Sequence, residues 1–387
     1  MGTNSGIPEG SYNFTRIDLC LGTRMSFGPF ALQWRRPSPN PPPSSPLPEG
    51  ITRSSIHTPS GPLELLTASP TTSAAYSDGE KPPLFFAHGA FGCAEQWLNY
   101  MQYFAAVGYP CYAISYRGHG KSWYPWFWRL YFTTRGTMVE DLTAGIKYVE
   151  ALEAARRGAP GTKVVLIAHS AGGALSQYAL SRNLFQVQGF CMFAAVPGFG
   201  SWGCYRFWAL TAPIHFTYRG YHSRYLLATV KQVQDAFFTA ETPVRHVQTF
   251  AKLLSPYESM LWPMQALNAF VTGPDVLSSI TSWAHRRSVP STSTSDRPMS
   301  ESNQRLFILA AEKDVLCTPA ILEDAAQRYR RAFKEMASND LEGSNLKQDD
   351  MENRVRFRVV DGVAHHLQNH EEWGKGADEV RKWLEQL

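Results

Sequence analysis

The chain has 387 residues, enough for one large α/β domain with an insertion or for roughly two to three smaller domains. Its net charge of +4, from 37 Lys and Arg against 33 Asp and Glu, is too small and too scattered along the sequence for a nucleic-acid-binding protein. Aromatic residues make up 13% and charged residues only 18%, so the chain can bury a large core and still keep apolar surface for a pocket or an interface.

The N-terminus and the cysteines limit where the protein works and what it binds. The first 26 residues lack the basic patch and apolar run of a secretory signal. No stretch approaches the about 18 consecutive apolar residues that make a membrane-spanning helix. The six cysteines are dispersed without a Cys-x-x-Cys pair, which argues against a zinc site or a disulfide framework. We therefore expect a cytoplasmic protein with no metal and no cofactor.

A proline-rich segment separates the N-terminal residues from the rest of the chain. Residues 37–48 read PSPNPPPSSPLP. Because proline fixes φ and lacks an amide donor, this segment favours an extended connector, and we expect residues 1–50 to form an arm that ends in it. Residues 51–69 then alternate weakly in polarity and turn at Pro59-Ser60-Gly61-Pro62, which predicts a β-hairpin.

From Leu84 onward, short apolar runs alternate with helical stretches, the pattern of a parallel sheet covered by helices on both faces. The predicted strands are 84–87, 111–115, 163–168, 189–194, 306–310 and 355–360. The predicted helices are 94–107, 137–156, 172–182, 319–334 and 371–387. Residues 198–303 are rich in Trp, Tyr and Phe at helical spacing and contain no convincing strand. We expect residues 51–387 to form one mostly parallel, doubly wound α/β domain with residues 198–303 as a helical cap insertion.

The most informative segment is an apolar run that leads directly into Ala168-His169-Ser170-Ala171-Gly172. A sharp strand-to-helix turn here would lift Ser170 Oγ above the sheet, and it requires small residues two positions away, which Ala168 and Gly172 provide. The common form of this turn has glycine where this chain has Ala168. The following helix directs the positive end of its dipole toward a developing anion. The alternative is a glycine-rich helix start in which Ser170 is only an N-cap.

A second glycine-rich turn, His88-Gly89-Ala90-Phe91-Gly92, follows the predicted strand at 84–87. Glycines at the carboxyl end of a strand allow a backbone N–H to point into the crevice where open α/β sheets bind ligands. We expect the N–H groups of Ala90 and Ala171 to form a two-donor oxyanion hole. Taken alone, the segment is more typical of a turn around a core histidine.

Together these motifs resemble the α/β-hydrolase family, and its serine esterase-like and lipase-like members in particular. His-Gly-Ala-Phe-Gly with Trp97, then Tyr-Arg-Gly-His-Gly-Lys-Ser at 116–122, then Ala-His-Ser-Ala-Gly-Gly occur in the family's order, within a resemblance that covers residues 51–387. Arg117 and His119 have the chemistry of catalytic residues, but the resemblance implies a structural role for their loop. The last loop and the proline-rich arm are similar to filamentous-fungal hydrolases, some of which serve specialised metabolism.

The resemblance also implies an acid and a histidine after the last two predicted strands. Asp314 matches the acid position, with Glu312 as the rival carboxylate, and His365 matches the base, with the adjacent His366 as its rival. The chain order Ser170, Asp314, His365 is that of the family. In these roles, His365 takes the proton of the serine and Asp314 orients the imidazole.

Residues 123–132, WYPWFWRLYF, form the densest aromatic block in the chain. Such a block most often packs under a cap or lines an apolar pocket, so we take Phe91, Trp123 and Trp126 as candidate substrate-binding residues. The alternative is contact with a membrane surface, where Trp and Tyr rings are favoured.

The sequence therefore predicts a serine hydrolase that cleaves an apolar ester, thioester or lactone through an acyl-enzyme. Its expected partner is a small apolar substrate, and no nucleic acid or partner protein is implied. Alternatives are an acyltransferase or lyase that uses the same triad in specialised metabolite biosynthesis, and a non-catalytic ligand-binding member of the fold. Epoxide or haloalkane hydrolysis is disfavoured because, by this resemblance, it would require Asp at position 170.

Overall fold

The computed structural model describes residues 24–27, 30–33, 46–70, 81–209, 226–255, 257–281, 304–340 and 354–387. Most of the predicted arm and part of the predicted cap lie outside these ranges. Within the arm, β1 (Arg24–Phe27) and β2 (Phe30–Gln33) pair as an antiparallel two-stranded sheet.

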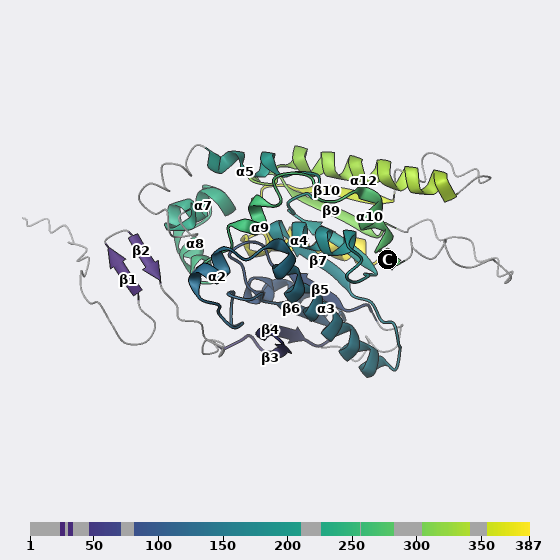
Figure 1. Cartoon of the computed structure of the whole chain (residues 1–387), viewed down its shortest axis with the longest axis horizontal. Coiled ribbons are helices and arrows are strands. Elements are labelled where there is room, and N and C mark those ends of the chain that lie inside the picture. Colours follow the sequence, from purple (N-terminus) through teal and green to yellow (C-terminus); the bar gives the residue numbers. More distant parts are fainter. Residues whose placement is uncertain are drawn as a thin grey trace, which may run out of the picture.

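An eight-stranded sheet forms the centre of the molecule, in the order β10-β9-β8-β7-β5-β6-β4-β3 (Figure 1). Strands β3 and β4 form the predicted hairpin, and β4 also pairs antiparallel with β6; the remaining neighbours are all parallel. This arrangement confirms the predicted mostly parallel α/β fold. The strands are β3 (Ile51–Thr58), β4 (Gly61–Ala68), β5 (Leu84–Ala87), β6 (Cys111–Ile114), β7 (Val165–His169), β8 (Gly189–Phe193), β9 (Leu306–Ala311) and β10 (Val355–Val360).

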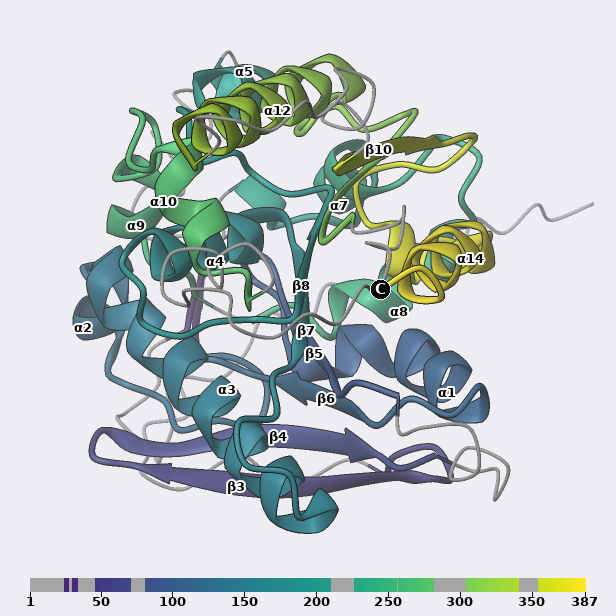
Figure 2. The ribbon, with the colours of Figure 1, turned by 90° about the vertical axis from the view of Figure 1, so that its right-hand side faces the viewer.

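The inner strands are buried on both faces because their side chains alternate between two cores. Phe85 and Ala87 of β5 belong to the core under α3, α4 and α12, whereas Leu84 and Phe86 belong to the core under α1 and α14. Figure 2 shows these helices on opposite sides of the sheet. The covering elements are η2 (Ala94–Trp97), α1 (Leu98–Ala106), α3 (Arg135–Arg157), α4 (Ser170–Ser181), α12 (Pro319–Asp340), η5 (Leu367–Asn369) and α14 (Trp373–Leu384).

The longest covering helix, α3, shows how local chemistry sets helix ends. It begins two residues before the predicted start at 137 because the Thr134 side chain accepts the Thr137 N–H and caps the first turn. It ends at Arg157, and the next residue, Gly158, takes the left-handed conformation with φ 60° that terminates a helix at little steric cost.

In the described part of the chain between β8 and β9, the regular elements are helices, and isolated bridges join Val187 to Ile280 and Phe199 to Ala269. Side chains of α7 and α8 join Phe91, which follows β5, and Leu316, which follows β9, in one buried apolar cluster. This segment therefore lies over the carboxyl ends of the strands. The helices not yet given are α2 (Phe127–Tyr131), α5 (Trp202–Ala209), α7 (Val230–Phe237), α8 (Val244–Ala251), α9 (Leu261–Met264) and α10 (Gly273–Ser278).

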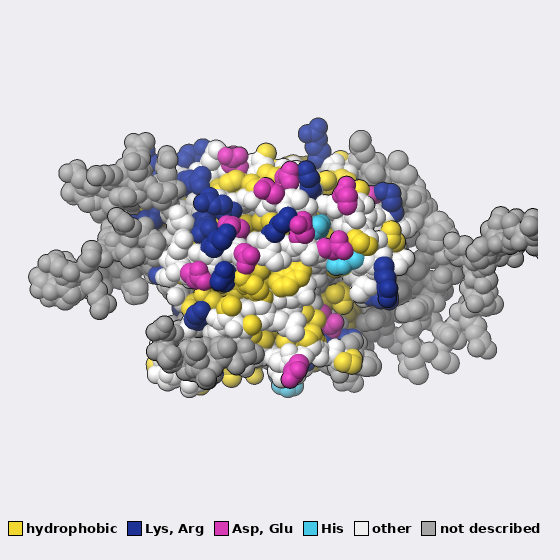
Figure 3. Space-filling view, turned by 180° about the vertical axis from the view of Figure 1, so that it is seen from behind, with side chains coloured by type: hydrophobic (Ala, Val, Ile, Leu, Met, Phe, Trp, Pro, Cys, Tyr) yellow, Lys and Arg dark blue, Asp and Glu magenta, His cyan; other side chains and the backbone are white. Residues whose placement is uncertain are grey.

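The surface carries charges of both signs. On the face in Figure 3, Lys and Arg side chains are interspersed with Asp and Glu, and no large block of one sign is visible there. Within the described ranges, none of the helices combines the length and the apolar character needed to cross a bilayer.

Candidate active site

Ser170 lies at the junction of β7 and α4. Its φ of 51° puts a non-glycine residue in the left-handed region, the strained conformation that turns the chain sharply from strand to helix. The turn has no space for larger neighbours. A Cβ on Gly172 would lie 2.2 Å from the His88 carbonyl oxygen, and one on Gly173 would lie 2.3 Å from Ala195 Cβ. Steric fit therefore accounts for the small residues that follow Ser170.

Three side chains from separate parts of the chain form a hydrogen-bonded series. His365, in the loop after β10, has Nε2 at 2.8 Å from Ser170 Oγ and Nδ1 at 2.7 Å from Asp314 Oδ2. Asp314, in the loop after β9, accepts the backbone N–H groups of Leu316 and Cys317 on its other oxygen. An ionised carboxylate can only accept hydrogen bonds, so Nδ1 of His365 donates to it and Nε2 is left to accept from the serine hydroxyl.

The two rival residues are engaged elsewhere. Glu312 is exposed, and its carboxylate accepts hydrogen bonds from Lys313 Nζ and the Gly362 N–H. The His366 ring is buried, with Nδ1 at 3.1 Å from Asn369 Nδ2. Burial and the two neighbouring histidines lower the pKa of His366 well below its usual value. Neither side chain takes part in the series above.

The backbone beside Ser170 offers two amides. Ala171 lies in the first turn of α4, and Ala90 follows Gly89 in the loop after β5. Gly89 packs against the serine, because a Cβ on it would be 2.8 Å from Ser170 Cβ. Among the hydrogen bonds of the described residues, none uses the N–H of Ala90 or of Ala171. Both amides can therefore donate to a ligand.

Two buried histidines support these turns. His88 Nδ1 lies 2.7 Å from the Gly89 carbonyl oxygen, and its Nε2 accepts the Tyr116 N–H. His169 Nε2 lies 3.0 Å from the His365 carbonyl oxygen and donates to it. Burial lowers the pKa of both His88 and His169 well below the usual range, so both rings are neutral and act as supports. Sequence reasoning missed this role of His169, whose only signal was its place next to the serine.

The three predicted substrate-binding residues have different surroundings. Trp123 is buried against the β3–β4 hairpin, where a Cβ on Gly61 would lie 2.4 Å from Trp123 Cγ, so its contacts are there rather than at Ser170. Trp126 is 48% exposed at the start of α2. Of the three, the structure brings only Phe91 into the apolar cluster over the strand ends, whose other buried members are Leu227, Val233, Ala236, Phe237, Phe238, Val247, Phe250, Leu254 and Leu316.

Two charged residues of the loop after β6, Arg117 and His119, are buried and paired with carboxylates. Arg117 forms ion pairs of 2.7 Å with Asp141 and 3.0 Å with Glu140. His119 Nε2 lies 3.0 Å from Glu258, a buried carboxylate of the segment between β8 and β9. Sequence reasoning missed Glu258, because no motif surrounds it and it is one of several acidic residues in an aromatic-rich insertion. These pairs fit a structural role for the loop.

Asp314, Cys317 and His365 place potential metal ligands within 4.8 Å of one another. However, the carboxylate and the imidazole are already bonded to each other. Burial, together with the contact to Cys204, raises the pKa of Cys317 far above its usual value, which keeps a thiol where a metal would need a thiolate. The donor set does not favour a metal ion here.

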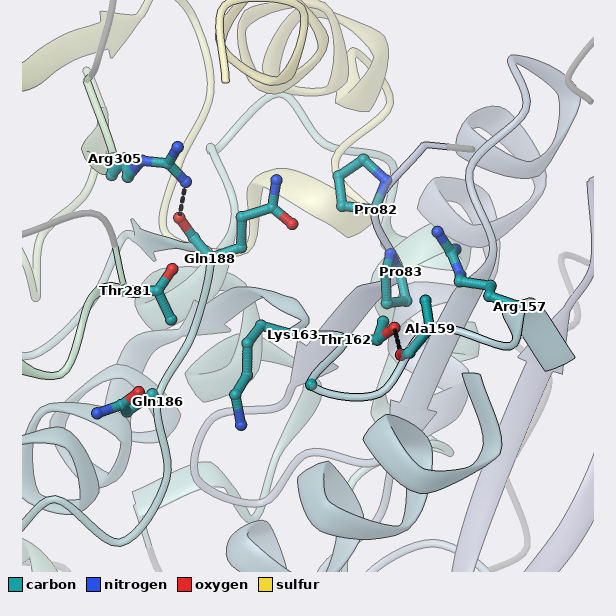
Figure 4. A pocket seen from close by; sticks show the side chains of 11 residues that line it. Pro82, Pro83, Arg157, Ala159, Thr162, Lys163, Gln186, Gln188, Thr281 and Arg305 are labelled. Carbon is teal, nitrogen blue, oxygen red and sulfur yellow. Dashed lines mark hydrogen bonds between the residues drawn. The ribbon is translucent and has the colours of Figure 1, made fainter. Parts of the chain in front are cut away.

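A cavity of about 770 Å³ opens elsewhere on the molecule (Figure 4). Its lining includes Pro83, Lys163 and Arg305, which precede β5, β7 and β9, and Arg305 donates to the Gln188 carbonyl oxygen at 2.8 Å. Because Ser170 follows the carboxyl end of β7, this cavity lies at the opposite edge of the sheet and does not belong to the candidate active site.

Solved structures share this architecture. The chain is similar to a thermophilic esterase from Thermogutta terrifontis studied with malate bound, at 15% identity and a TM-score of 0.53 over 86% of this chain and 98% of that one. It is also similar to the esterase EaEST from Exiguobacterium antarcticum, at 15% identity and a TM-score of 0.53 over 86% of this chain and 100% of that one. A third similar structure is carboxylesterase CesB from Bacillus subtilis, at 14% identity and a TM-score of 0.50 over 87% of this chain and 92% of that one. At such identities these likenesses show the fold.

The sequence model of the alpha/beta hydrolase family matches residues 84–373. The matched region runs from β5 to the first residue of α14, and it contains Ser170, Asp314 and His365. The chain therefore belongs to the α/β hydrolase family.

Proposed function

We propose that this protein is a serine hydrolase that cleaves an apolar ester, thioester or lactone through an acyl-enzyme. The observation that carries the proposal is the buried hydrogen-bonded series from Ser170 through His365 to Asp314. A serine hydroxyl is a weak nucleophile at neutral pH, and this arrangement supplies a base with a fixed tautomer next to it. The similar solved structures named above are esterases, which fits the same class of reaction.

In the first half-reaction, Ser170 Oγ attacks the carbonyl carbon while its proton passes to His365 Nε2. Asp314 stabilises the resulting imidazolium without taking its proton. The oxyanion of the tetrahedral intermediate accepts from the N–H groups of Ala90 and Ala171, and removing one such donor typically costs about 10²–10³ in rate. The leaving group departs with the proton from His365. In the second half-reaction, water attacks the acyl-enzyme and gives a proton to His365. His365 returns this proton to Ser170 Oγ as the carboxylic acid product leaves.

The segment over the strand ends supports an apolar substrate. We take the helices within residues 198–303 as the cap, because side chains of α7 and α8 pack on Phe91 and Leu316 close to the series. Phe237 of α7 also stacks on the His365 ring, with centroids 5.8 Å apart. An acyl chain that enters beside Ser170 would meet mainly aliphatic and aromatic side chains, and each buried methylene contributes about 0.8 kcal/mol.

Covalent labelling tests the nucleophile. A fluorophosphonate probe should label the wild-type chain and should not label Ser170→Ala. Ser176→Ala is the matched control, since Ser176 lies in the same helix but its hydroxyl is buried and donates to the Gly172 carbonyl oxygen. This control should be labelled like the wild type. Labelling of Ser170→Ala at full strength would contradict the proposal.

Hydrolysis of p-nitrophenyl esters of increasing acyl length tests the substrate class. Because added methylenes find apolar surroundings, kcat/KM should rise from acetate to longer chains, by up to about fourfold per methylene. A preference confined to acetate would contradict the apolar pocket while leaving the nucleophile assignment intact.

A further inference from the structure

Glu258, in the cap, is a buried carboxylate that contacts the loop carrying the Ala90 amide. Its Oε2 accepts the Phe91 N–H at 2.7 Å and lies 3.0 Å from His119 Nε2. Its Oε1 accepts the Ser259 N–H at 2.7 Å and the Trp262 Nε1–H at 3.2 Å. These four nitrogen partners all face a group that can only accept, so the site matches a carboxylate on both oxygens.

His119 supplies the positive charge that this carboxylate needs. Its Nδ1 lies 2.9 Å from the Arg117 carbonyl oxygen, and its Nε2 faces Glu258. Since both ring nitrogens face acceptors, both must carry hydrogen, which makes the ring an imidazolium. Burial opposes this charge, but the carboxylate outweighs it and raises the pKa of His119.

The cap binds both backbone groups of Phe91, in the loop after β5 that carries the Ala90 N–H. Glu258 accepts the Phe91 N–H, and the Ser255 N–H donates to the Phe91 carbonyl oxygen at 2.8 Å. Phe91 has a φ of 58°, a strained conformation for a side chain of this size, so it persists only where the surroundings impose it. The Phe91 N–H belongs to the peptide unit that joins Ala90 to Phe91. The hydrogen bond from this N–H to Glu258 therefore also restricts the backbone conformation of Ala90.

We propose that Glu258 and His119 are positioning residues that hold the Ala90 N–H in its oxyanion-binding orientation and so couple the cap to the catalytic step. This inference rests on the proposed hydrolase function. Neither side chain touches the reacting atoms; both act through Phe91. The cap thus contributes to transition-state binding as well as covering the substrate.

Glu258→Gln is the sharpest single change. The amide keeps the shape of the side chain but turns an NH₂ group toward two N–H donors, either those of Phe91 and His119 or those of Ser259 and Trp262. Because oxyanion contacts form mainly in the transition state, kcat should fall about 10²-fold with KM nearly unchanged. Inhibition by an aryl trifluoromethyl ketone, whose adduct with the serine bears an oxyanion, should weaken by the same factor.

Glu64→Gln is the matched control. Glu64 is also a buried carboxylate with several donors, namely Arg53 Nε, Ser115 Oγ and the Lys121 N–H, but it lies in β4 and does not contact Phe91. It should lose thermal stability as Glu258→Gln does while its kcat and inhibition constant remain near wild type. Equal kinetic losses in both variants would overturn the proposal, because the effect would then come from general destabilisation.

His119→Gln keeps the proposal testable where Glu258→Gln does not fold. Glutamine can still donate one N–H to Glu258 but supplies no charge, so kcat should fall by a smaller factor, again without a matching rise in KM. Wild-type kcat and wild-type ketone inhibition in His119→Gln, or in a folded Glu258→Gln, would overturn the positioning role alone. A wild-type chain that neither hydrolyses esters nor reacts with the fluorophosphonate would overturn the hydrolase function, and the positioning role with it.

Discussion

Gly89 packs directly on Ser170, so that a Cβ added to Gly89 would stand 2.8 Å from Ser170 Cβ and 3.0 Å from His169 Nδ1. The loop after β5 and the turn after β7 are therefore interlocked at a position with no side chain. The proposed oxyanion donor, Ala90, is the next residue along the first of these segments. The placement of Ser170 relative to the Ala90 N–H therefore depends on the absence of a side chain at position 89.

We expect Gly89→Ala to reduce kcat for ester hydrolysis by about 10²-fold or more, because a displacement near 1 Å at a reacting group costs about that factor. The measurement is steady-state kinetics with a p-nitrophenyl ester. Gly136→Ala is the control, since a Cβ on the exposed Gly136 of α3 would meet nothing closer than 3.7 Å. This control should keep full activity, and an equally active Gly89→Ala would show that the loop yields freely.

Asp314→Asn should lower kcat by about 10⁴-fold, the loss seen when the orienting carboxylate of a serine protease triad becomes an amide. The physical reason is that an amide can present a donor to His365 Nδ1 and stabilise the wrong tautomer. Glu312→Gln should remain close to wild type, because Glu312 is exposed and bonds only to neighbours away from the imidazole. A reversed result would move the acid role to Glu312.

Much of the architecture could be predicted because its signals are local. Strands buried on both faces must be apolar throughout, and the turn at Ser170 excludes large neighbours through contacts with atoms such as the His88 carbonyl oxygen. Each requirement produces a sequence pattern that is only a few residues long.

Other features depend on partners that are distant in the chain. The sequence motif contains His119, but its partner Glu258 comes from an insertion with no motif, so nothing local predicts the pair. Trp123 lies in an aromatic block that suggests a pocket, yet its position is set by Gly61 of the hairpin. The choice between adjacent histidines depends on the direction of one loop, which the bond from His169 to the His365 carbonyl oxygen helps to fix.

His365→Gln should reduce kcat by roughly 10⁴-fold or more, since removal of the base disables the serine as a nucleophile. His366→Gln should retain activity but lose about 1–3 kcal/mol of stability, because the His366 ring is buried against Phe250 with centroids 4.4 Å apart. Kinetics and urea unfolding on the same preparations separate the two effects. A large kinetic loss confined to His366→Gln would reassign the base.

The buried pair of His119 and Glu258 also makes stability depend on pH. Burial opposes both charges, but Glu258 raises the pKa of His119 above the usual 6.5, and His119 with its neighbouring N–H donors lowers the pKa of Glu258 below the usual 4.5. The histidine's contribution is complete below pH 6.5 and is lost as pH rises through its raised pKa. The contribution of Glu258 to stability is complete above pH 4.5 and is lost as pH falls through the lowered pKa of Glu258.

The pair should therefore stabilise the fold most between pH 4.5 and 6.5. We expect the free energy of unfolding of His119→Gln to lie about 3–5 kcal/mol below that of the wild type in this window, because one charge of a buried pair is left without its partner. The difference should shrink as pH rises through the pKa of His119, and urea titrations across the range measure it. Asp141 also raises the pKa of His119, and His119 lowers that of His88, so both interactions are lost with His119 and form part of the measured difference. Tyr116 responds to burial, Asp141 and Glu258, which both proteins keep. A difference that stays constant with pH would mean that His119 is neutral in the folded protein.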